Sequence, residues 1–197
     1  MSEAVSEAGL ARAVDAVRAG EVIGIPTDTV YGLGADPWRP ETAGRLFAIK
    51  GRPESVALPV LVGDPAAADE LAELDERALR LAAAFWPGPL TLVVRRRRGV
   101  ELHLGGEAAT VGIRCPGREL TRTLLRRTGP LAVTSANRHG ERPFTEASEL
   151  AGLGVSVVVD GGTCDGAPSS VVSLVGDTIE VLREGALSED VLLEAVL

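Results

Sequence analysis

Residues 22–34 read VIGIPTDTVYGLG, a short apolar run that ends at a proline and leads into a polar turn. The run 22–25 is too short for a helix and is bounded by glycine and proline, which predicts a buried strand. Thr27-Asp28-Thr29 then places two hydroxyls and a carboxylate directly after the strand, where α/β sheets present ligand-binding loops. An ordinary capped loop explains the same residues. Gly32-Leu33-Gly34 favours a plain turn, because it lacks the third glycine of a dinucleotide motif.

Helices and short strands are predicted on both sides of this stretch. Helices are expected over residues 6–19, 41–50 and 118–127, and a last one that Ser188 caps. Two more helices fill 65–85, with Leu79, Ala82 and Phe85 inward. Strands are expected over 58–62, 90–94, 110–114, 131–134, 155–159, 170–174 and 178–182, the last two as a hairpin. Pro59 indicates a sheet edge or a strand start. The order predicts an α/β (α+β) fold with a twisted mixed sheet.

Composition limits the class of protein and its surroundings. The 197 residues suffice for one domain, and 45% hydrophobic against 24% charged residues supply a core. A formal charge of −8 opposes a stand-alone nucleic-acid binder. Two cysteines do not build a disulfide scaffold. The N-terminus lacks a signal-peptide pattern, and no apolar run is long enough for a membrane helix. We therefore expect a cytoplasmic protein.

Several strand ends carry hydroxyl or guanidinium groups. Lys50, the only lysine among 20 basic residues, precedes Gly51-Arg52 at a helix end, where it either satisfies the helix or clamps phosphate. Ser135 and Asn137 follow the strand 131–134, and a simple turn is an equal alternative for them. Ser169, Arg114 and Arg183 lie at other strand ends. Together these groups favour an oxyanion-binding cleft.

Other polar residues point to structure more than to chemistry. The run Arg95-Arg96-Arg97-Arg98 before Gly99 favours a solvated loop, with a local RNA contact as the alternative. Asp28 and Asp36 are interpreted as capping residues. His103 and His139 are isolated, so neither a zinc site nor histidine catalysis is predicted.

Five ordered motifs between about residues 10 and 187 resemble the YrdC-like family, the L-threonylcarbamoyladenylate synthases. They are residues 26–34, Lys50-Gly51-Arg52-Pro53, Trp86-Pro87-Gly88-Pro89-Leu90-Thr91, Ser135-Ala136-Asn137 and Pro168-Ser169-Ser170-Val171-Val172. The resemblance implies a single YrdC-like domain over 1–197 with a large concave cavity. Longer family members add a second C-terminal domain, which we do not expect here.

The resemblance also implies the reaction and the site. Family members join L-threonine, bicarbonate and ATP into threonylcarbamoyl-adenylate and pyrophosphate, and a downstream transferase modifies adenosine 37 of tRNA. Mg²⁺ is expected with ATP, without a protein-borne metal site, and double-stranded RNA binding or a local tRNA contact is implied. By motif position, Lys50 and Arg52 are catalytic. The L-threonine contacts are Thr29, Arg114 and Ser169, and the ATP contacts are Arg52, Thr110, Ser135, Asn137 and Arg183.

The chain departs from the family pattern at a few positions. Val56-Ala57 precede Leu58 where the family has a polar residue and proline, Leu61 replaces a histidine, and His139 replaces a serine. Two alternatives therefore stay open. One is a YrdC-like paralogue that uses another amino acid or acyl donor, and the other is a non-catalytic nucleotide- or RNA-binding module.

Overall fold

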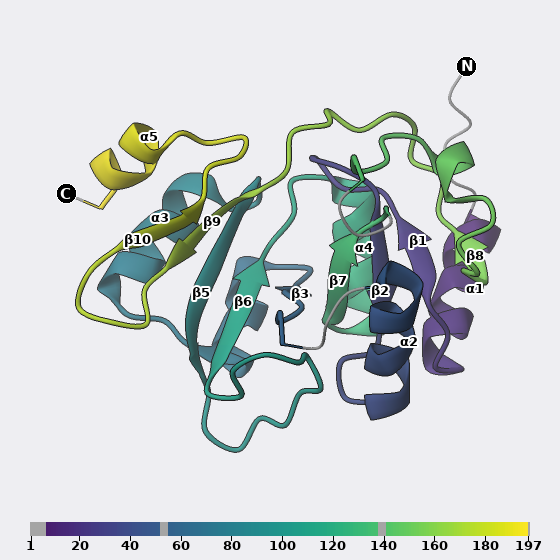
Figure 1. Ribbon diagram of the computed structural model, residues 1–197, viewed down its shortest axis with the longest axis horizontal. Helices are drawn as coiled ribbons and strands as arrows, with labels where there is room; N and C mark the ends of the chain where they lie inside the picture. Colours follow the sequence, from purple (N-terminus) through teal and green to yellow (C-terminus); the bar gives the residue numbers. More distant parts are fainter. Residues whose placement is uncertain (1–6, 52–54, 138–140, 197) are drawn as a thin grey trace.

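The computed structural model describes residues 7–51, 55–137 and 141–196 (Figure 1). Its α-helices are α1 (Glu7–Arg18), α2 (Pro40–Lys50), α3 (Glu76–Phe85), α4 (Glu119–Thr128) and α5 (Glu189–Glu194), with 3-10 turns at Pro65–Glu70 and Ala147–Leu150. The strands are β1 (Ile23–Ile25), β2 (Gly32–Ala35), β3 (Val60–Leu61), β4 (Ala72–Glu73), β5 (Leu90–Arg96), β6 (Thr110–Arg114), β7 (Leu131–Ser135), β8 (Val157–Val158), β9 (Ser170–Ser173) and β10 (Glu180–Arg183).

The strands form one mixed sheet in the order β10-β9-β5-β6-β3-β7-β2-β1-β8, and β4 pairs with β5 outside this path. Parallel pairs such as β5/β9 and β3/β6 alternate with antiparallel pairs such as β5/β6 and β2/β7. The predicted fold class is therefore confirmed. β3 lies inside the sheet, so Pro59 marks a strand start and not an edge.

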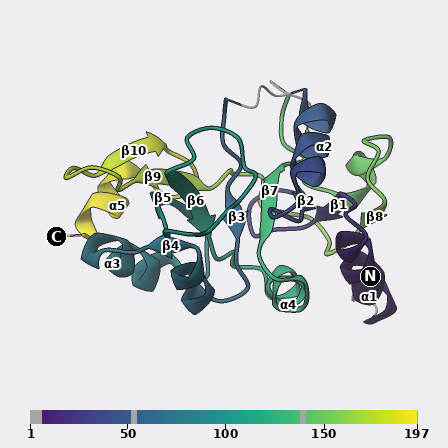
Figure 2. The same cartoon turned by 90° about the horizontal axis from the view of Figure 1, so that it is seen from below.

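Helices cover both sides of the sheet, as Figure 2 shows, with α2 on one side and α1, α3 and α4 on the other. Sheet twist accumulates to roughly 80–100° over the four steps from β5 to β2. As a result, the side chains on one face of the sheet pack against α3 at β5 and against α2 at β2. On the opposite face of the sheet, Leu61 of β3 packs with Leu124 and Leu125 of α4.

The segment Gly32-Leu33-Gly34 is strand β2, so the predicted turn is wrong. β2 pairs with both β1 and β7 in the middle of the sheet. A Cβ on Gly32 would come within 2.7 Å of a Val133 methyl group, and one on Gly24 within 2.4 Å of a Leu150 methyl group. Glycine here permits close packing of neighbouring side chains onto the strands, which a sequence pattern does not distinguish from a turn.

Three smaller expectations are also corrected. Leu79 is 51% exposed and does not face the core, because α3 buries Ala78, Leu81 and Ala82 instead. Arg95 and Arg96 belong to β5 and not to a loop. Ser188 occupies the N-cap position of α5, but its side chain makes no capping hydrogen bond.

The main predicted elements are found close to their expected bounds, including α1, α2, α4 and the β9/β10 hairpin. Among the described residues, no helix combines the length and apolarity needed to cross a membrane.

Candidate functional site

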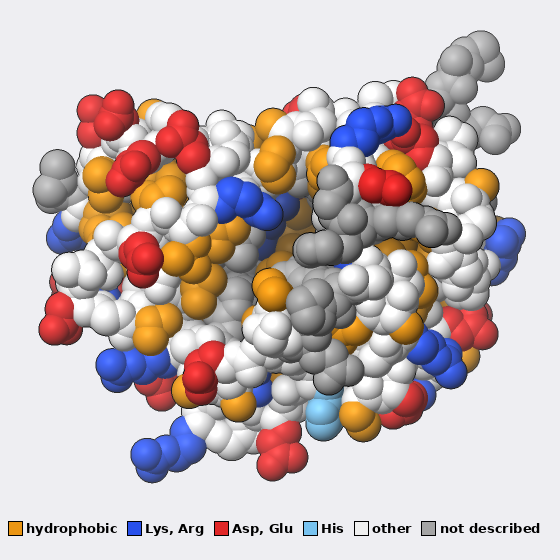
Figure 3. Space-filling view, in the orientation of Figure 1, with side chains coloured by type: hydrophobic (Ala, Val, Ile, Leu, Met, Phe, Trp, Pro, Cys, Tyr) orange, Lys and Arg blue, Asp and Glu red, His pale blue; other side chains and the backbone are white. Residues whose placement is uncertain are grey.

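A pocket of about 450 Å³ opens on the sheet, and the face in Figure 3 is hollowed near its centre. Its floor comes from residues that share one ladder face, including Thr91 and Val93 of β5 and Thr110, Gly112 and Arg114 of β6. Thr27, Thr29, Ser135, Ser169 and Arg183 add polar groups, whereas Val56, Ala57, Pro59, Leu61, Val133, Pro168 and Val171 add apolar walls. The charged side chains of this described lining are Arg114 and Arg183, without a carboxylate. The lining therefore favours an anionic ligand.

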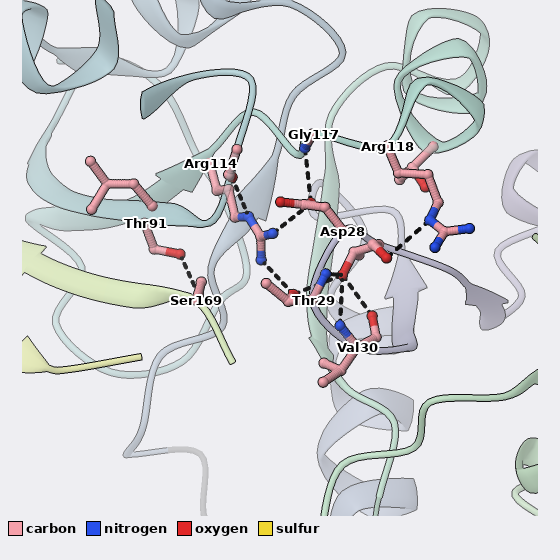
Figure 4. A network of polar contacts seen from close by, with 12 residues as sticks. Asp28, Thr29, Val30, Thr91, Arg114, Gly117, Arg118 and Ser169 are labelled. Carbon is pink, nitrogen blue, oxygen red and sulfur yellow. Dashed lines mark hydrogen bonds and ion pairs between the residues drawn. The ribbon is translucent and has the colours of Figure 1, made fainter. Parts of the chain in front are cut away.

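Arg114 is the buried cation of the pocket and ends strand β6. Its guanidinium forms a 2.6 Å ion pair with Asp28 and donates to Thr29 Oγ1 at 3.0 Å and to the Gly88 carbonyl at 2.9 Å (Figure 4). Burial lowers the pKa of Arg114. The negative charge of Asp28 acts in the opposite direction and raises this pKa, whereas the nearby positive charge of Arg183 lowers it further. Asp28 pairs with Arg114, whereas Arg183 binds Ser169, so the two guanidinium groups give this part of the pocket an excess of positive charge.

The turn after β1 presents Thr29 to Arg114. Thr27 Oγ1 accepts hydrogen bonds from the backbone N–H groups of Thr29 and Val30, both at 3.1 Å, and donates to the Val30 carbonyl at 2.6 Å. Asp28 also accepts from the Gly117 N–H at 2.9 Å. Because backbone and side chain are both tied, the turn holds Thr29 Oγ1 in place without help from a ligand.

Ser169 forms the opposite wall, just before β9. Its hydroxyl lies 3.1 Å from Thr91 Oγ1 and accepts from Arg183 Nη2 at 3.0 Å, while Arg183 Nε donates to the Ser169 carbonyl at 2.9 Å. Arg183 comes from β10, the strand next to β9. The β9/β10 hairpin and β5 therefore place a cation and two hydroxyls together at this wall.

Lys50 and the Ser135-Ala136-Asn137 motif meet at the end of β7. Lys50 Nζ donates to the Ser135 carbonyl at 2.7 Å, to Ser135 Oγ at 2.9 Å and to Asn137 Oδ1. Asn137 Nδ2 in turn donates to the Glu141 carbonyl at 2.5 Å. Two motifs separated by 85 residues in the sequence thus form one polar cluster.

The structure brings most of the predicted residues to this region. Six of them line the pocket: Thr29, Thr110, Arg114, Ser135, Ser169 and Arg183. Lys50 and Asn137 contact Ser135, whereas Arg52 and His139 lie outside the described residues. Val56 and Leu61, the two apolar departures, also line the pocket. The roles of these residues stay predictions.

The sequence analysis missed several positioning groups. Asp28 was interpreted as a cap, but it is the ion-pair partner of Arg114, which lies 86 residues away. Thr91 had a detectable signal, because it alternates with Leu90 and Leu92 and so faces away from their core. Arg96 turns inward and donates to the Leu102 carbonyl at 3.1 Å, so only part of the arginine run is solvated.

Fold and site together define a class: an α/β protein whose twisted mixed sheet carries a pocket lined by hydroxyl groups and arginines. Within this class the chain belongs to the Sua5/YciO/YrdC family, because that family's model, described as "Telomere recombination", matches residues 15–185. The family assignment made from the five motifs is thereby confirmed.

Individual relatives match nearly the whole chain. A putative threonylcarbamoyl-AMP synthase of Mycobacterium tuberculosis (strain H37Rv) is 37% identical over 193 residues, which cover 95% of this chain and 89% of the relative. The crystal structure of Pyrococcus abyssi Sua5 complexed with L-threonine matches with a TM-score of 0.92 and 32% identity, over 98% of this chain and 59% of that one. Escherichia coli YciO matches with a TM-score of 0.85 and 26% identity, over 95% and 92% of the two chains. The chain thus spans somewhat more than half the length of the Pyrococcus protein.

Proposed function

We propose that this protein is a threonylcarbamoyl-AMP synthase, a transferase that uses ATP, L-threonine and bicarbonate. The observation that carries the proposal is the pocket lined by Thr29, Arg114, Ser169 and Arg183, in a fold that matches Sua5 complexed with L-threonine. Relatives named as threonylcarbamoyl-AMP synthases at 34–37% identity, over most of this chain, support the same activity.

The reaction has two balanced steps. The amine of L-threonine takes up bicarbonate and releases water, which gives a carbamate. A carbamate oxygen then attacks the α-phosphorus of ATP. A new P–O bond forms as the bond to pyrophosphate breaks, so the products are threonylcarbamoyl-AMP and pyrophosphate.

Arg114 is suited to hold the carboxylate of the amino acid. The described contacts use three of its five N–H groups, on Gly88, Thr29 and Asp28, which leaves one N–H on Nη1 and one on Nη2 for a carboxylate. Because Asp28 and the Thr27 turn hold the guanidinium, binding needs little reorganisation. Carboxylate binding here would leave the amine to face the rest of the pocket.

Arg183 and the Lys50 cluster supply charge and hydrogen bonds for the nucleotide. Negative charge grows on the phosphates as pyrophosphate leaves, and preorganised cations stabilise that charge best in a site that excludes water. The apolar walls of Val56, Leu61 and Val171 restrict water around the labile carbamate. Positioning and electrostatics, more than acid–base catalysis, therefore drive the reaction.

Mg²⁺ would arrive with the nucleotide. Among the residues that the structure describes, no group of three histidine, cysteine or acidic side chains could hold a metal. Mg²⁺ commonly binds through substrate phosphates and waters, which suits a pocket whose charged lining is cationic. We assign no protein ligand to it.

The assay is threonine-dependent synthesis of the adenylate. We would incubate the purified protein with ATP, L-threonine, bicarbonate and Mg²⁺, measure pyrophosphate and the adenylate mass, and omit threonine in a parallel sample. Arg183→Ala should reduce the rate about 100-fold, the size typical of losing one transition-state donor. Arg98→Ala is the matched control, because Arg98 is exposed on the loop after β5.

Near-normal turnover in both Arg183→Ala and Arg52→Ala would reject the assignment of these residues. Adenylate formation with another amino acid, but not with threonine, would support the paralogue instead. That outcome would draw attention to Val56 and Leu61, which make the pocket wall apolar.

The cellular context extends the proposal. We propose that the product passes to a transferase acting on tRNA, and that any contact of this chain with RNA is local to the exposed Arg95, Arg97 and Arg98. Such binding should weaken steeply as salt rises. Salt-insensitive or absent binding would dismiss the RNA contact without affecting the synthase proposal.

A further inference from the structure

Arg118 is a cation outside the pocket that binds three backbone carbonyl groups at once. It precedes α4 and donates from Nε to the Thr27 carbonyl at 3.0 Å (Figure 4). It also donates from Nη2 to the Thr163 carbonyl at 2.9 Å and from Nη1 to the Gly161 carbonyl. Thr27 belongs to the turn that holds Thr29, whereas Gly161 and Thr163 belong to a distant segment. One guanidinium therefore joins two parts of the chain that lie 134 and more residues apart.

The distant segment, residues 159–169, is here called the strap. It runs without regular secondary structure from β8 to β9 across the top of the molecule (Figure 1). Its glycines leave its backbone few intrinsic restraints, and Gly162 and Gly166 have positive φ angles of 78° and 93°. Contacts with the rest of the protein must therefore define its path.

The strap continues directly into the pocket. The Gly166 N–H donates to the Thr29 carbonyl at 2.7 Å, and Pro168 and Ser169 at its end line the pocket wall opposite Thr29. Tyr31 adds a second tie, because its hydroxyl donates to the Gly162 carbonyl at 2.9 Å and accepts from the Gly161 N–H at 3.1 Å. The separation of the Thr29 and Ser169 walls thus depends on where the strap is fixed.

We propose that Arg118 is a positioning residue for L-threonine, which locks the strap to the Thr27 turn and so sets the spacing between Thr29 and Ser169. Arg118 does not line the pocket, so it acts through these two segments and not by contact with substrate. The role depends on the geometry of the guanidinium fork, because three carbonyls in different directions require donors that a single ammonium group does not place together. The inference rests on the proposed function, since it assigns L-threonine to the pocket.

The experiment compares Arg118→Ala and Arg118→Lys with the unchanged protein and with Arg127→Ala. Arg127 is a matched control on α4, the helix that Arg118 precedes, because its side chain is 39% exposed and pairs with Glu7 away from the pocket. L-threonine affinity is measured by calorimetry without ATP, and amide exchange of the strap by mass spectrometry. The peptide that contains β5 serves as the internal reference for exchange.

We expect Arg118→Ala to weaken L-threonine binding about tenfold, the effect of losing roughly one charge-assisted hydrogen bond. Exchange of strap amides, that of Gly166 included, should accelerate while β5 exchange stays unchanged. In the synthase assay the KM for L-threonine should rise more than kcat falls. Arg118→Lys should recover only part of the affinity, and Arg127→Ala should resemble the unchanged protein.

Two results would overturn the inference: L-threonine affinity within twofold of normal in Arg118→Ala, or full recovery in Arg118→Lys, which would mean that charge alone suffices. Failure of the proposed function can be distinguished from failure of the inference about Arg118. If the unchanged protein binds no L-threonine, the synthase proposal fails, and unaltered strap exchange in Arg118→Ala would still reject the structural part of the inference.

Discussion

Replacing Asp28 by asparagine tests how the buried cation of the pocket is held. The substitution keeps the size of the side chain and an oxygen that can accept from the Gly117 N–H, but it removes the charge facing Arg114. The ion pair is 2.6 Å long, and the Arg114 side chain is only 6% exposed against 20% for Asp28. Arg114 would therefore stay desolvated without its countercharge.

The expected loss of stability follows from that geometry. Removing one partner of a fully buried ion pair costs about 3–5 kcal/mol. Asp28 is partly exposed and the amide retains one hydrogen bond, so we expect about 2 kcal/mol in the free energy of unfolding. For a chain of this size that corresponds to a fall of about 4–8 °C in Tm.

Urea and thermal unfolding measure this loss, with Asp64→Asn as the matched control. Asp64 pairs with Arg126, but both side chains are exposed, at 51% and 39%, so its removal should cost less than about 0.5 kcal/mol. L-threonine affinity should fall in Asp28→Asn alone. If both variants lose the same small amount, Arg114 does not depend on Asp28, and the argument for a preorganised cradle is refuted.

Two further predictions concern other buried groups. Lys50→Met should abolish adenylate synthesis while costing only about 1–2 kcal/mol of stability. The methionine fills the space but removes the ammonium group that donates to Ser135 and Asn137, and Asn137 Oδ1 keeps only its hydrogen bond from Ser135 Oγ. Equal pyrophosphate release in both proteins would contradict this role. Burial raises the pKa of the Cys115 thiol to about 11 from 9.0, so the neutral thiol contributes stability that is present below pH 9 and is lost as the pH rises to about 11. Cys115→Ala should flatten the stability curve over that interval, as measured by urea unfolding at each pH; parallel curves would show that another group is responsible.

Local patterns predicted the elements well where periodicity was clear. α1, α2 and α4 follow from apolar spacing, and the β9/β10 hairpin follows from two short apolar runs around a turn. β2 was missed because Gly32 is required by the close packing of Val133, which comes from the neighbouring strand β7 and is distant in the sequence. Leu79 was misplaced because the helical pattern of α3 admits two apolar stripes, and only the docking of the helix decides between them.

The motifs predicted the residues that line the pocket but not the residues that hold them in place. Thr29, Arg114 and Ser169 could be named because each falls in or near a family motif and lies next to a short strand or at its end. The residues that hold these side chains in place could not be named. Asp28, Gly117 and Arg118 act through hydrogen bonds to residues that lie 86 to 91 positions away in the sequence. Sequence spacing carries no information about such pairs until the order of the strands is known.

The order of the strands also explains why an arginine can be buried here. Leu61 and Arg114 are cross-strand partners on one face of the sheet and both line the pocket, but Leu61 also packs with Leu124 and Leu125 of α4. Arg114 therefore lies where the cover by α4 ends, so that it is buried and also lines the pocket.

Gly112, on the same strand and the same face as Arg114, belongs to the floor of the pocket. A Cβ there would meet Pro59 at 3.4 Å and Thr91 at 3.5 Å, ordinary contact distances, so packing alone does not demand a glycine. A side chain at Gly112 would extend into the pocket that Gly112 and Arg114 both line.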